Sequence, residues 1–213
     1  MSGMELWVCN LGRLEYGDAV ALQERIRARV QAGELPGVLL LLEHPPVYTR
    51  GRRSDAGELP MGEAWYRAQG IDVVQTDRGG KLTYHGPGQL VGYPIMRVGD
   101  VPAFVARMER AITDALAETG VQARGRSADG REYTGVWAGD RKIASIGVHI
   151  SRGVLTTSMP WARHQSSPIA RSPGSERRPS VYTGSCSSSS MTSSSSPACT
   201  RARSRSWIST PFS

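Results

Sequence analysis

The stretch that decides how this chain folds is residues 77–89, which read DRGGKLTYHGPGQ. Two adjacent glycines and a Gly-Pro-Gly turn surround one arginine, one threonine and one histidine, between two segments of strand-like composition. Adjacent glycines let backbone N–H groups approach a ligand, because no Cβ stands in the way. Arg78 offers a rigid fork of donors, and His85 can transfer a proton near neutral pH. The stretch predicts either a ligand-binding loop or a plain tight hairpin with a solvated Arg78 and a hydrogen-bonded His85, and composition leaves both open.

The segments around this stretch alternate between strand and helix patterns. Residues 16–30 carry apolar side chains four positions apart, and residues 101–116 repeat them every three or four positions, so each predicts an amphipathic helix. Strands outnumber helices, which favours an α+β (mixed α/β) domain over a doubly wound parallel sheet. The expected strands are residues 5–9, 38–43, 71–75, 81–84, 89–95, 135–138 and 142–150.

Composition divides the chain at residue 157. Residues 158–213 contain 19 Ser and 6 Pro, and their seven Arg, absence of Lys and single acidic residue give +6 of the formal net charge of +7. The apolar periodicity also ends there, and such a segment buries too little apolar surface to offset its ordering entropy. We therefore expect residues 1–157 to form the folded domain and residues 158–213 to be a disordered tail.

Several classes of protein are disfavoured by the same sequence. The longest aliphatic run, residues 38–42, is far shorter than the about 20 residues of a membrane span. The first ten residues lack the pattern of a secretory signal. Cys9, Cys186 and Cys199 are odd in number and widely spaced, which argues against a disulfide scaffold or a structural zinc site. We expect a cytoplasmic protein that binds neither metal nor membrane, and seven arginines over the tail are too sparse for a nucleic-acid surface.

A family resemblance rests on three stretches of the sequence. Residues 78–95, RGGKLTYHGPGQLVGYPI, are similar to the signature of the lipoyl(octanoyl) transferases of lipoate biosynthesis. Residues 41–52, LLEHPPVYTRGR, and residues 135–148, GVWAGDRKIASIGV, resemble the upstream and downstream segments of the same family. The resemblance implies a biotin/lipoate ligase-like catalytic domain, with residues 1–157 as an acyltransferase domain that is incomplete at its C-terminus.

The resemblance also implies an octanoyltransferase reaction in two steps. A cysteine thiolate takes the octanoyl group from acyl carrier protein, and a lysine of a lipoyl domain then takes it from the cysteine. The acceptors would be lipoyl domains of 2-oxoacid dehydrogenase or glycine cleavage proteins, and no cofactor is needed. Lys142 stands where the family has the lysine that lowers the pKa of the cysteine. The substrate-binding residues implied are Arg78, Gly79, Gly80, Lys81, Leu82, Thr83, Tyr84, His85, Ser145, Ile146 and Gly147.

The residues around Lys142 support this role in part. If residues 142–150 form one strand, Lys142 opens an otherwise apolar face, where a partly desolvated ammonium could stabilise a thiolate. A solvated lysine at a strand end fits the same pattern. Two other functions remain open, an ATP-dependent lipoate or biotin ligase and a non-catalytic binding protein with a basic tail. His44, His149 and His164 receive no role.

The nucleophile that the reaction needs is missing from the sequence. After residue 157, where the resemblance ends, the family continues with a His-Gly pair and then a catalytic cysteine in a Pro-Cys-Gly motif. In this sequence Cys186 and Cys199 have other neighbours, and Cys9 lies on the first expected strand. An abrupt change to Ser, Arg and Pro is what an out-of-frame reading of a GC-rich gene would give, and a divergent tail is the alternative. Either way, we expect an impaired and unstable enzyme.

Overall fold

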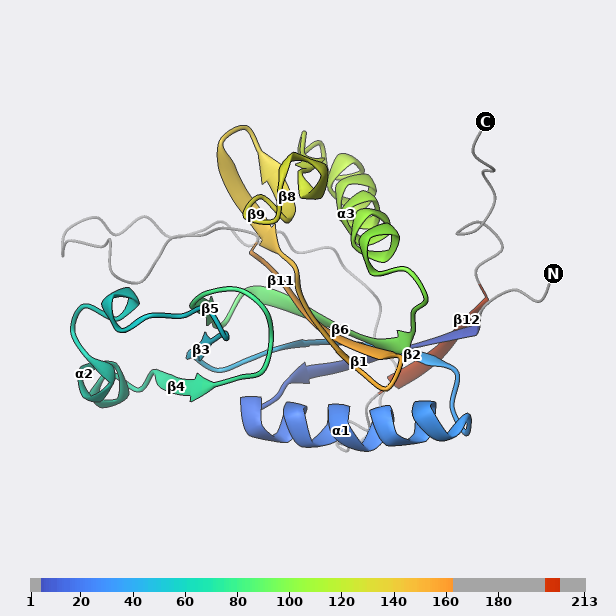
Figure 1. Cartoon of the computed structure of the whole chain (residues 1–213), viewed down its shortest axis with the longest axis horizontal. Coiled ribbons are helices and arrows are strands. Elements are labelled where there is room, and N and C mark those ends of the chain that lie inside the picture. The colour runs from blue at the N-terminus through green and yellow to red at the C-terminus, as the bar shows by residue number, and fades with distance from the viewer. Residues whose placement is uncertain (1–4, 163–197, 204–213) are drawn as a thin grey trace, which may run out of the picture.

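Most strands of the protein join one sheet. The computed structural model describes residues 5–162 and 198–203, and Figure 1 shows their arrangement. In the described part, nine strands form the main sheet in the order β12-β1-β2-β6-β11-β9-β8-β7, with β10 paired to β11. β1 and β2 run parallel, and the other pairs are antiparallel. The strands are β1 (Glu5–Arg13), β2 (Gly37–Glu43), β6 (Gln89–Arg97), β7 (Arg124–Gly125), β8 (Gly135–Ala138), β9 (Arg141–Ser145), β10 (Gly147–Ser151), β11 (Val154–Ala162) and β12 (Ala198–Arg203).

Two long helices cover opposite faces of the main sheet (Figure 1). α1 (Tyr16–Ala32) packs on the face that carries Val91, Tyr93 and Ile95 of β6. α3 (Val101–Ala117) packs on the other face, where its Phe104 contacts Met96. Side chains of a strand alternate between faces, so β6 serves both helices and lies at the centre of the core.

A small second sheet lies beside the main one (Figure 1). It has the order β4-β3-β5, with β3 (Val47–Arg50), β4 (Asp72–Gln75) and β5 (Thr83–His85). The short helix α2 (Glu63–Ala68) and the 3-10 turn η1 (Ala56–Glu58) cover it. Its own core consists of Tyr48, Leu59, Tyr66 and Val73, with Ile71, Leu82 and Tyr84 packed against them.

The predicted mixed α/β class and both predicted long helices are confirmed, while one strand prediction needs correction and two short elements were missed. Residues 142–150 do not form one strand: the chain breaks at Ile146 between β9, which lies between β8 and β11, and β10, which pairs with another part of β11. β3 and α2 were not predicted, since four and six residues are too short to show a period.

Two segments of the expected disordered tail are strands. β11 continues through residue 157 to Ala162, because it pairs with β6 along its length, and β12 pairs with β1. Residues 198–203, ACTRAR, contain neither Ser nor Pro, so the average composition of the tail hid them. The rest of that tail, with Cys186 and His164, lies outside the described residues.

The state of Cys9 also differs from the prediction, which was that the three cysteines form no disulfide scaffold. It is buried on β1 and is disulfide-bonded, and the strand register sets Cys199 opposite it. Sequence spacing gave no disulfide pattern, because the pairing of β1 with β12 joins residues far apart in the chain.

Candidate functional site

A cleft of about 550 Å³ opens between the start of α1, the loop after β4 and the β10–β11 hairpin. Its volume lies within the about 300–1,000 Å³ of small-molecule sites. Polar side chains form most of its lining, together with the aliphatic Val20 and Val74. The lining includes Tyr16, Gly17, Val20, Gln23, Glu24, Arg27, Val74, Gln75, Thr76, Asp77, Arg78, Tyr93, His149 and Thr156.

Arg78 is held in a fixed position at this cleft. Its Nε and Nη2 donate to Thr49 Oγ1 at 3.2 and 2.8 Å, and Nη2 also donates to the Thr49 carbonyl at 2.6 Å. Burial lowers the pKa of Arg78, and nearby Tyr16, Tyr93 and Glu58 counteract this in part. Arg78 is therefore an anchored cation, not the solvated arginine of the hairpin alternative.

His85 lies behind Arg78 and is fully buried. Its Nδ1 lies 3.0 Å from Gln89 Oε1, and its Nε2 lies 3.3 Å from Thr49 Oγ1. Burial, with the nearby His44 and Arg78, lowers the pKa of His85 to about 3. The neutral ring consequently donates from Nδ1 to Gln89 and accepts at Nε2 from Thr49. A ring held in this way orients Thr49 and Arg78 and is a poor proton carrier near neutral pH.

His44 forms a second buried link, to the floor of the cleft. Its Nδ1 donates to the Leu14 carbonyl at 2.8 Å, and its Nε2 lies 2.7 Å from the Tyr93 hydroxyl. Burial lowers the pKa of His44, so the neutral ring accepts the hydrogen bond from Tyr93. The ring centroids of His44 and His85 lie 5.7 Å apart, and that of Tyr16 lies 5.3 Å from His44. These rings join α1, β2, β5 and β6 into one rigid wall.

The glycines of the signature allow the loop to pack closely. A Cβ on Gly51 would lie 2.4 Å from the carbonyl oxygen of Gly80, so only glycine fits at position 51. A Cβ on Gly79 would lie 3.7 Å from the carbonyl oxygen of Val148, at the start of β10. The structure thus brings the backbone of Gly79 beside that of Val148, the residue after the predicted Gly147.

The other predicted substrate-binding residues lie in different surroundings. Lys81 is exposed and pairs with Glu58 at 3.8 Å, while Leu82 and Tyr84 pack in the core of the small sheet. Thr83 pairs with Thr49 in the β3–β5 ladder. Ile146 packs under α3, and Ser145 and Gly147 are the adjacent ends of β9 and β10. Of the predicted set, Arg78 lines the cleft directly.

Lys142 lies on β9, outside the lining of this cleft. Its Nζ donates to the carbonyls of Thr134 and Glu132 at 3.1 and 3.3 Å and lies 5.0 Å from the centroid of the Trp137 ring. Burial lowers the pKa of Lys142, Glu109 raises it and Arg126 lowers it. The half-buried ammonium is thus fixed by backbone carbonyls, unlike a solvated lysine at a strand end.

Several residues of this site received no role from the sequence, among them Tyr16, Thr49, Tyr93 and His149, and His44 is another. Tyr93 lies within the resembling stretch, but its alternation with Val91 and Ile95 made it look like a plain core residue. Thr49 lies on β3, a strand that was not predicted. His149 lines the cleft through the β10–β11 hairpin, and no local pattern marks it.

Among residues 5–162 and 198–203, the His, Cys, Asp and Glu side chains form no group of three or more that could hold a metal ion. No helix in the same part of the chain has the length and apolarity to cross a membrane.

Solved structures with the same fold are lipoate ligases. Lipoate-protein ligase A bound with ATP has a TM-score of 0.62 at 20% identity, over 78% of this chain and 68% of that chain. A bipartite lipoate protein ligase from Thermoplasma acidophilum has a TM-score of 0.58 at 20% identity, over 78% of this chain and 67% of that one. These likenesses show that the chain has the fold of the lipoate ligases.

More particularly, the chain belongs to the family of the lipoyl protein ligase A/B catalytic domain, whose model matches residues 15–159. An octanoyltransferase of Solibacter usitatus is 47% identical over 150 residues, which are 68% of this chain and 66% of that protein. The octanoyltransferase of Geobacter sulfurreducens is 46% identical over 151 residues, which are 69% of this chain and 60% of that protein. The resemblance to octanoyltransferases is confirmed, and the chain spans less than two thirds of these relatives.

Proposed function

We propose that this chain is an octanoyltransferase, which takes an octanoyl group from acyl carrier protein and passes it to a lysine of a lipoyl domain. The observation that carries the proposal is the 46–47% identity to octanoyltransferases over the segment that builds the cleft and its anchored Arg78. The acceptors we propose are lipoyl domains of 2-oxoacid dehydrogenase and glycine cleavage proteins. The cytoplasm is the proposed compartment, on the family resemblance alone.

The proposed chemistry is acyl transfer through a thioester. A cysteine thiolate attacks the thioester carbonyl of the donor, and the carrier thiol leaves with a proton. The neutral lysine amine of the lipoyl domain then attacks the acyl-cysteine, releases the thiolate and loses a proton as the amide forms. A fixed cation near the cysteine would favour its thiolate form, and that is the role we propose for Lys142.

We propose that the octanoyl donor binds in the cleft beside Arg78. Residues 79–85 and 145–147 would act mainly through the backbone positions that shape this wall, since Leu82, Tyr84 and Ile146 are committed to core packing. Anchored positions of this kind hold a thioester in one orientation better than mobile surface groups do.

We further propose that transfer by the chain as written is impaired. Cys9 is buried in the core between α1 and the main sheet and is disulfide-bonded, so it cannot attack a thioester in the cleft. Cys186 and Cys199 follow the family match, which ends at residue 159, and neither has the Pro-Cys-Gly surroundings of the family. Donor binding and acyl transfer are therefore expected to separate in this chain.

The test measures binding and transfer independently. The full chain is incubated with octanoyl-acyl carrier protein and a lipoyl domain, with and without ATP, and octanoylation of the lipoyl domain is read by intact mass. Donor binding is measured by calorimetry for the wild type and for two matched variants, Val20→Trp and Val121→Trp. Val20 lines the cleft and is 37% exposed, whereas Val121 lies outside the cleft lining and is 38% exposed.

We expect donor binding that weakens at least about tenfold in Val20→Trp and stays unchanged in Val121→Trp, with slow transfer that does not need ATP. Octanoylation that requires ATP and free octanoate would identify a ligase instead. Equal binding by both variants would refute the cleft as the donor site. Salt-sensitive nucleic-acid binding without donor binding would favour a basic-tailed binding protein.

A further inference from the structure

Glu109 is a buried carboxylate that the proposed reaction does not use. It lies on α3, is 4% exposed and accepts hydrogen bonds from two separate positions of the chain. Ser127 N lies 3.0 and 3.2 Å from its two oxygens, Ser127 Oγ lies 2.6 Å from Oε2, and Gly135 N lies 2.8 Å from Oε1. A buried carboxylate needs such donors to offset its lost hydration.

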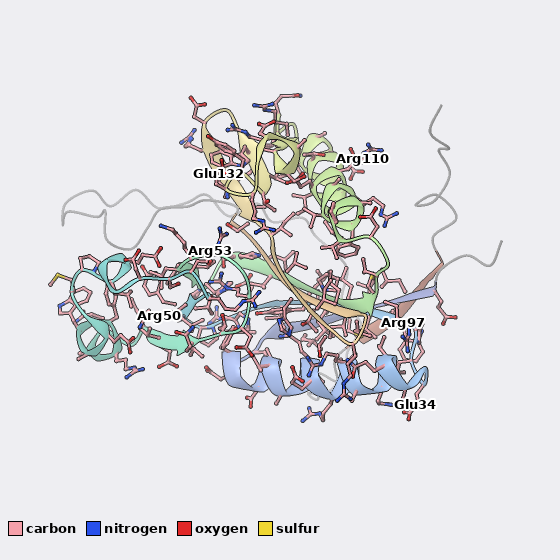
Figure 2. The ribbon with its side chains drawn as sticks, in the orientation of Figure 1. Glu34, Arg50, Arg53, Arg97, Arg110 and Glu132 are labelled. Carbon is pink, nitrogen blue, oxygen red and sulfur yellow. The ribbon has the colours of Figure 1, made fainter. Side chains whose placement is uncertain are left out.

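These donors are the two ends of one loop, residues 127–135. Between them, the carbonyls of Glu132 and Thr134 accept from Lys142 Nζ at 3.3 and 3.1 Å. The carbonyl of Tyr133 accepts from Trp137 Nε1 at 2.8 Å. Figure 2 shows the labelled Glu132 at the β8–β9 end of the molecule, on the side of α3. The carboxylate thus anchors the loop, and the loop holds the ammonium.

Two glycines make room for this arrangement. A Cβ on Gly125 would lie 2.6 Å from both Glu109 Cβ and Glu109 Oε2. A Cβ on Gly135 would lie 2.3 Å from the carbonyl oxygen of Ala144, and Gly135 has a φ of 132° that disfavours other residues. Gly125 therefore lets the backbone pass close to the carboxylate, and Gly135 lets β8 pack closely against β9.

The charges that face Lys142 come from α3 and from the loop. Glu109 raises the pKa of Lys142, and Arg126 lowers it. Arg126 is itself fixed, with its guanidinium carbon 4.2 Å from the centroid of the Tyr133 ring and 4.8 Å from that of Trp137. It also pairs with Asp129 at 2.7 Å.

We propose that Glu109 is the positioning residue for Lys142: by binding both ends of the 127–135 loop, its carboxylate fixes the carbonyls that hold the Lys142 ammonium. The inference rests on the proposed function, because it gives Lys142 its purpose there. Glu109 contacts neither the cleft nor substrate, so it acts through the loop and through its charge.

The test uses the full chain and needs no substrate. Lys142 and Lys81 are the two lysines of the sequence, so limited acetylation followed by mass spectrometry reports Lys142 with Lys81 as internal reference. For each variant, the rate of Lys142 acetylation at pH 8 is divided by its plateau rate at high pH. This ratio removes differences between variants in how accessible Lys142 is to the reagent. Amide hydrogen exchange of residues 127–135 is measured in parallel. The variants are Glu109→Gln, Ser127→Ala and, as the matched control at the C-cap of the same helix, the exposed Glu118→Gln.

Glu109→Gln removes the charge but keeps the size of the side chain. In this variant we expect the ratio of the Lys142 acetylation rate at pH 8 to the plateau rate to rise about threefold, because the neutral amine forms more easily without the nearby negative charge. Ser127→Ala keeps the charge and should leave the ratio unchanged, while exchange in the loop becomes faster. Glu118→Gln should change neither readout.

An unchanged or smaller ratio in Glu109→Gln, with loop exchange accelerated, would reduce Glu109 to a packing role and overturn the proposal. Unaltered exchange in both Glu109→Gln and Ser127→Ala would overturn it as well. Failure of octanoyl transfer would leave these results untouched, so the two proposals can fail separately.

Discussion

At the scale of single residues, the wall of the cleft depends on polar groups that are buried and paired. Thr49 and His85 are both fully buried, and together with Gln89 they form a chain of hydrogen bonds that ends on Arg78. A buried donor or acceptor that loses its partner costs more than the hydrogen bond itself contributes. Each member of this chain should therefore be sensitive to substitutions that preserve shape.

Thr49→Val tests this sensitivity. It keeps the side-chain shape but removes the Oγ1 that accepts from Arg78, and we expect a loss of about 1–3 kcal/mol in the free energy of unfolding. Thr113→Val is the matched control, because the hydroxyl of Thr113 donates to the carbonyl of Arg110 within α3, and it should change stability by less than about 0.5 kcal/mol. Urea unfolding measures both, and equal losses would contradict the buried network.

His85 predicts a definite dependence of stability on pH. Its pKa is about 3 in the folded chain against 6.5 for a free ring, so between these values the unfolded chain binds a proton that the folded chain rejects. Stability from this residue is present above pH 6.5 and is lost as the pH falls toward 3, by about 1.4 kcal/mol per pH unit.

The measurement is urea unfolding of the wild type and His85→Asn from pH 8 to pH 4.5. Below pH 6 the free energy of unfolding should fall less steeply with decreasing pH in the variant than in the wild type, by the slope that one bound proton contributes. Between pH 7 and 8 the two curves of unfolding free energy against pH should run parallel, which is the internal control. Curves that stay parallel throughout would mean that His85 takes up a proton in the folded protein.

At the scale of elements, the sequence could predict those helices and strands that are long enough to show a repeating or continuous pattern of apolar residues. α1 and α3 show several helical turns of apolar spacing, and residues 38–42 form an uninterrupted aliphatic strand. β3 and α2 are too short for this and are fixed by the small core around Tyr48 and Tyr66. The break at Ile146 arises from the choice of pairing partners, which a local pattern does not contain.

The same limit applies to the site. The dense signature pointed to Arg78, which lines the cleft, because it lies in a contiguous motif. The roles proposed for His85 and Lys142, which are not among the lining residues, stay predictions. Tyr16 and His149 come to the cleft from distant elements through tertiary packing, and residues 124–135 receive their shape from the buried Glu109. Contacts of this kind become visible only when the sheet order is known.

The β8–β9 hairpin gives the prediction at this scale. In Gly135→Ala the new Cβ would meet the carbonyl oxygen of Ala144 at 2.3 Å, and φ at this position is 132°. We expect a loss of about 2–5 kcal/mol in urea unfolding, with faster amide exchange in β8 and β9. Gly99→Ala, where nothing lies within 4 Å, should be nearly neutral. A neutral Gly135→Ala would show that the hairpin shifts freely to accept the methyl group.

At the scale of the whole molecule, the match to the family and the two cysteines that we propose cannot serve as the nucleophile, Cys186 and Cys199, lie in different parts of the sequence. The match to the family runs to residue 159, and the cleft, Arg78 and Lys142 all precede that point. The proposed defect is therefore confined to the supply of a nucleophile.

A graft tests this separation. The segment of the Solibacter usitatus octanoyltransferase that follows the matched region is joined after residue 159 in place of the native segment. We expect transfer from octanoyl-acyl carrier protein to a lipoyl domain to increase at least about 100-fold, because a placed nucleophile contributes more than that in covalent catalysis. The same graft with its cysteines changed to alanine is the control. If both grafts are equally slow while donor binding is intact, the defect lies in residues 1–159.

The register of β11 determines where any such segment starts its path. Ala162, the last residue of that strand, is paired with Gln89, the residue whose side chain holds His85. The described part of β11 therefore ends one strand away from the residue that holds the buried histidine. If the proposed function is correct, a group attached directly after β11 needs only a short connection to reach the wall that contains His85.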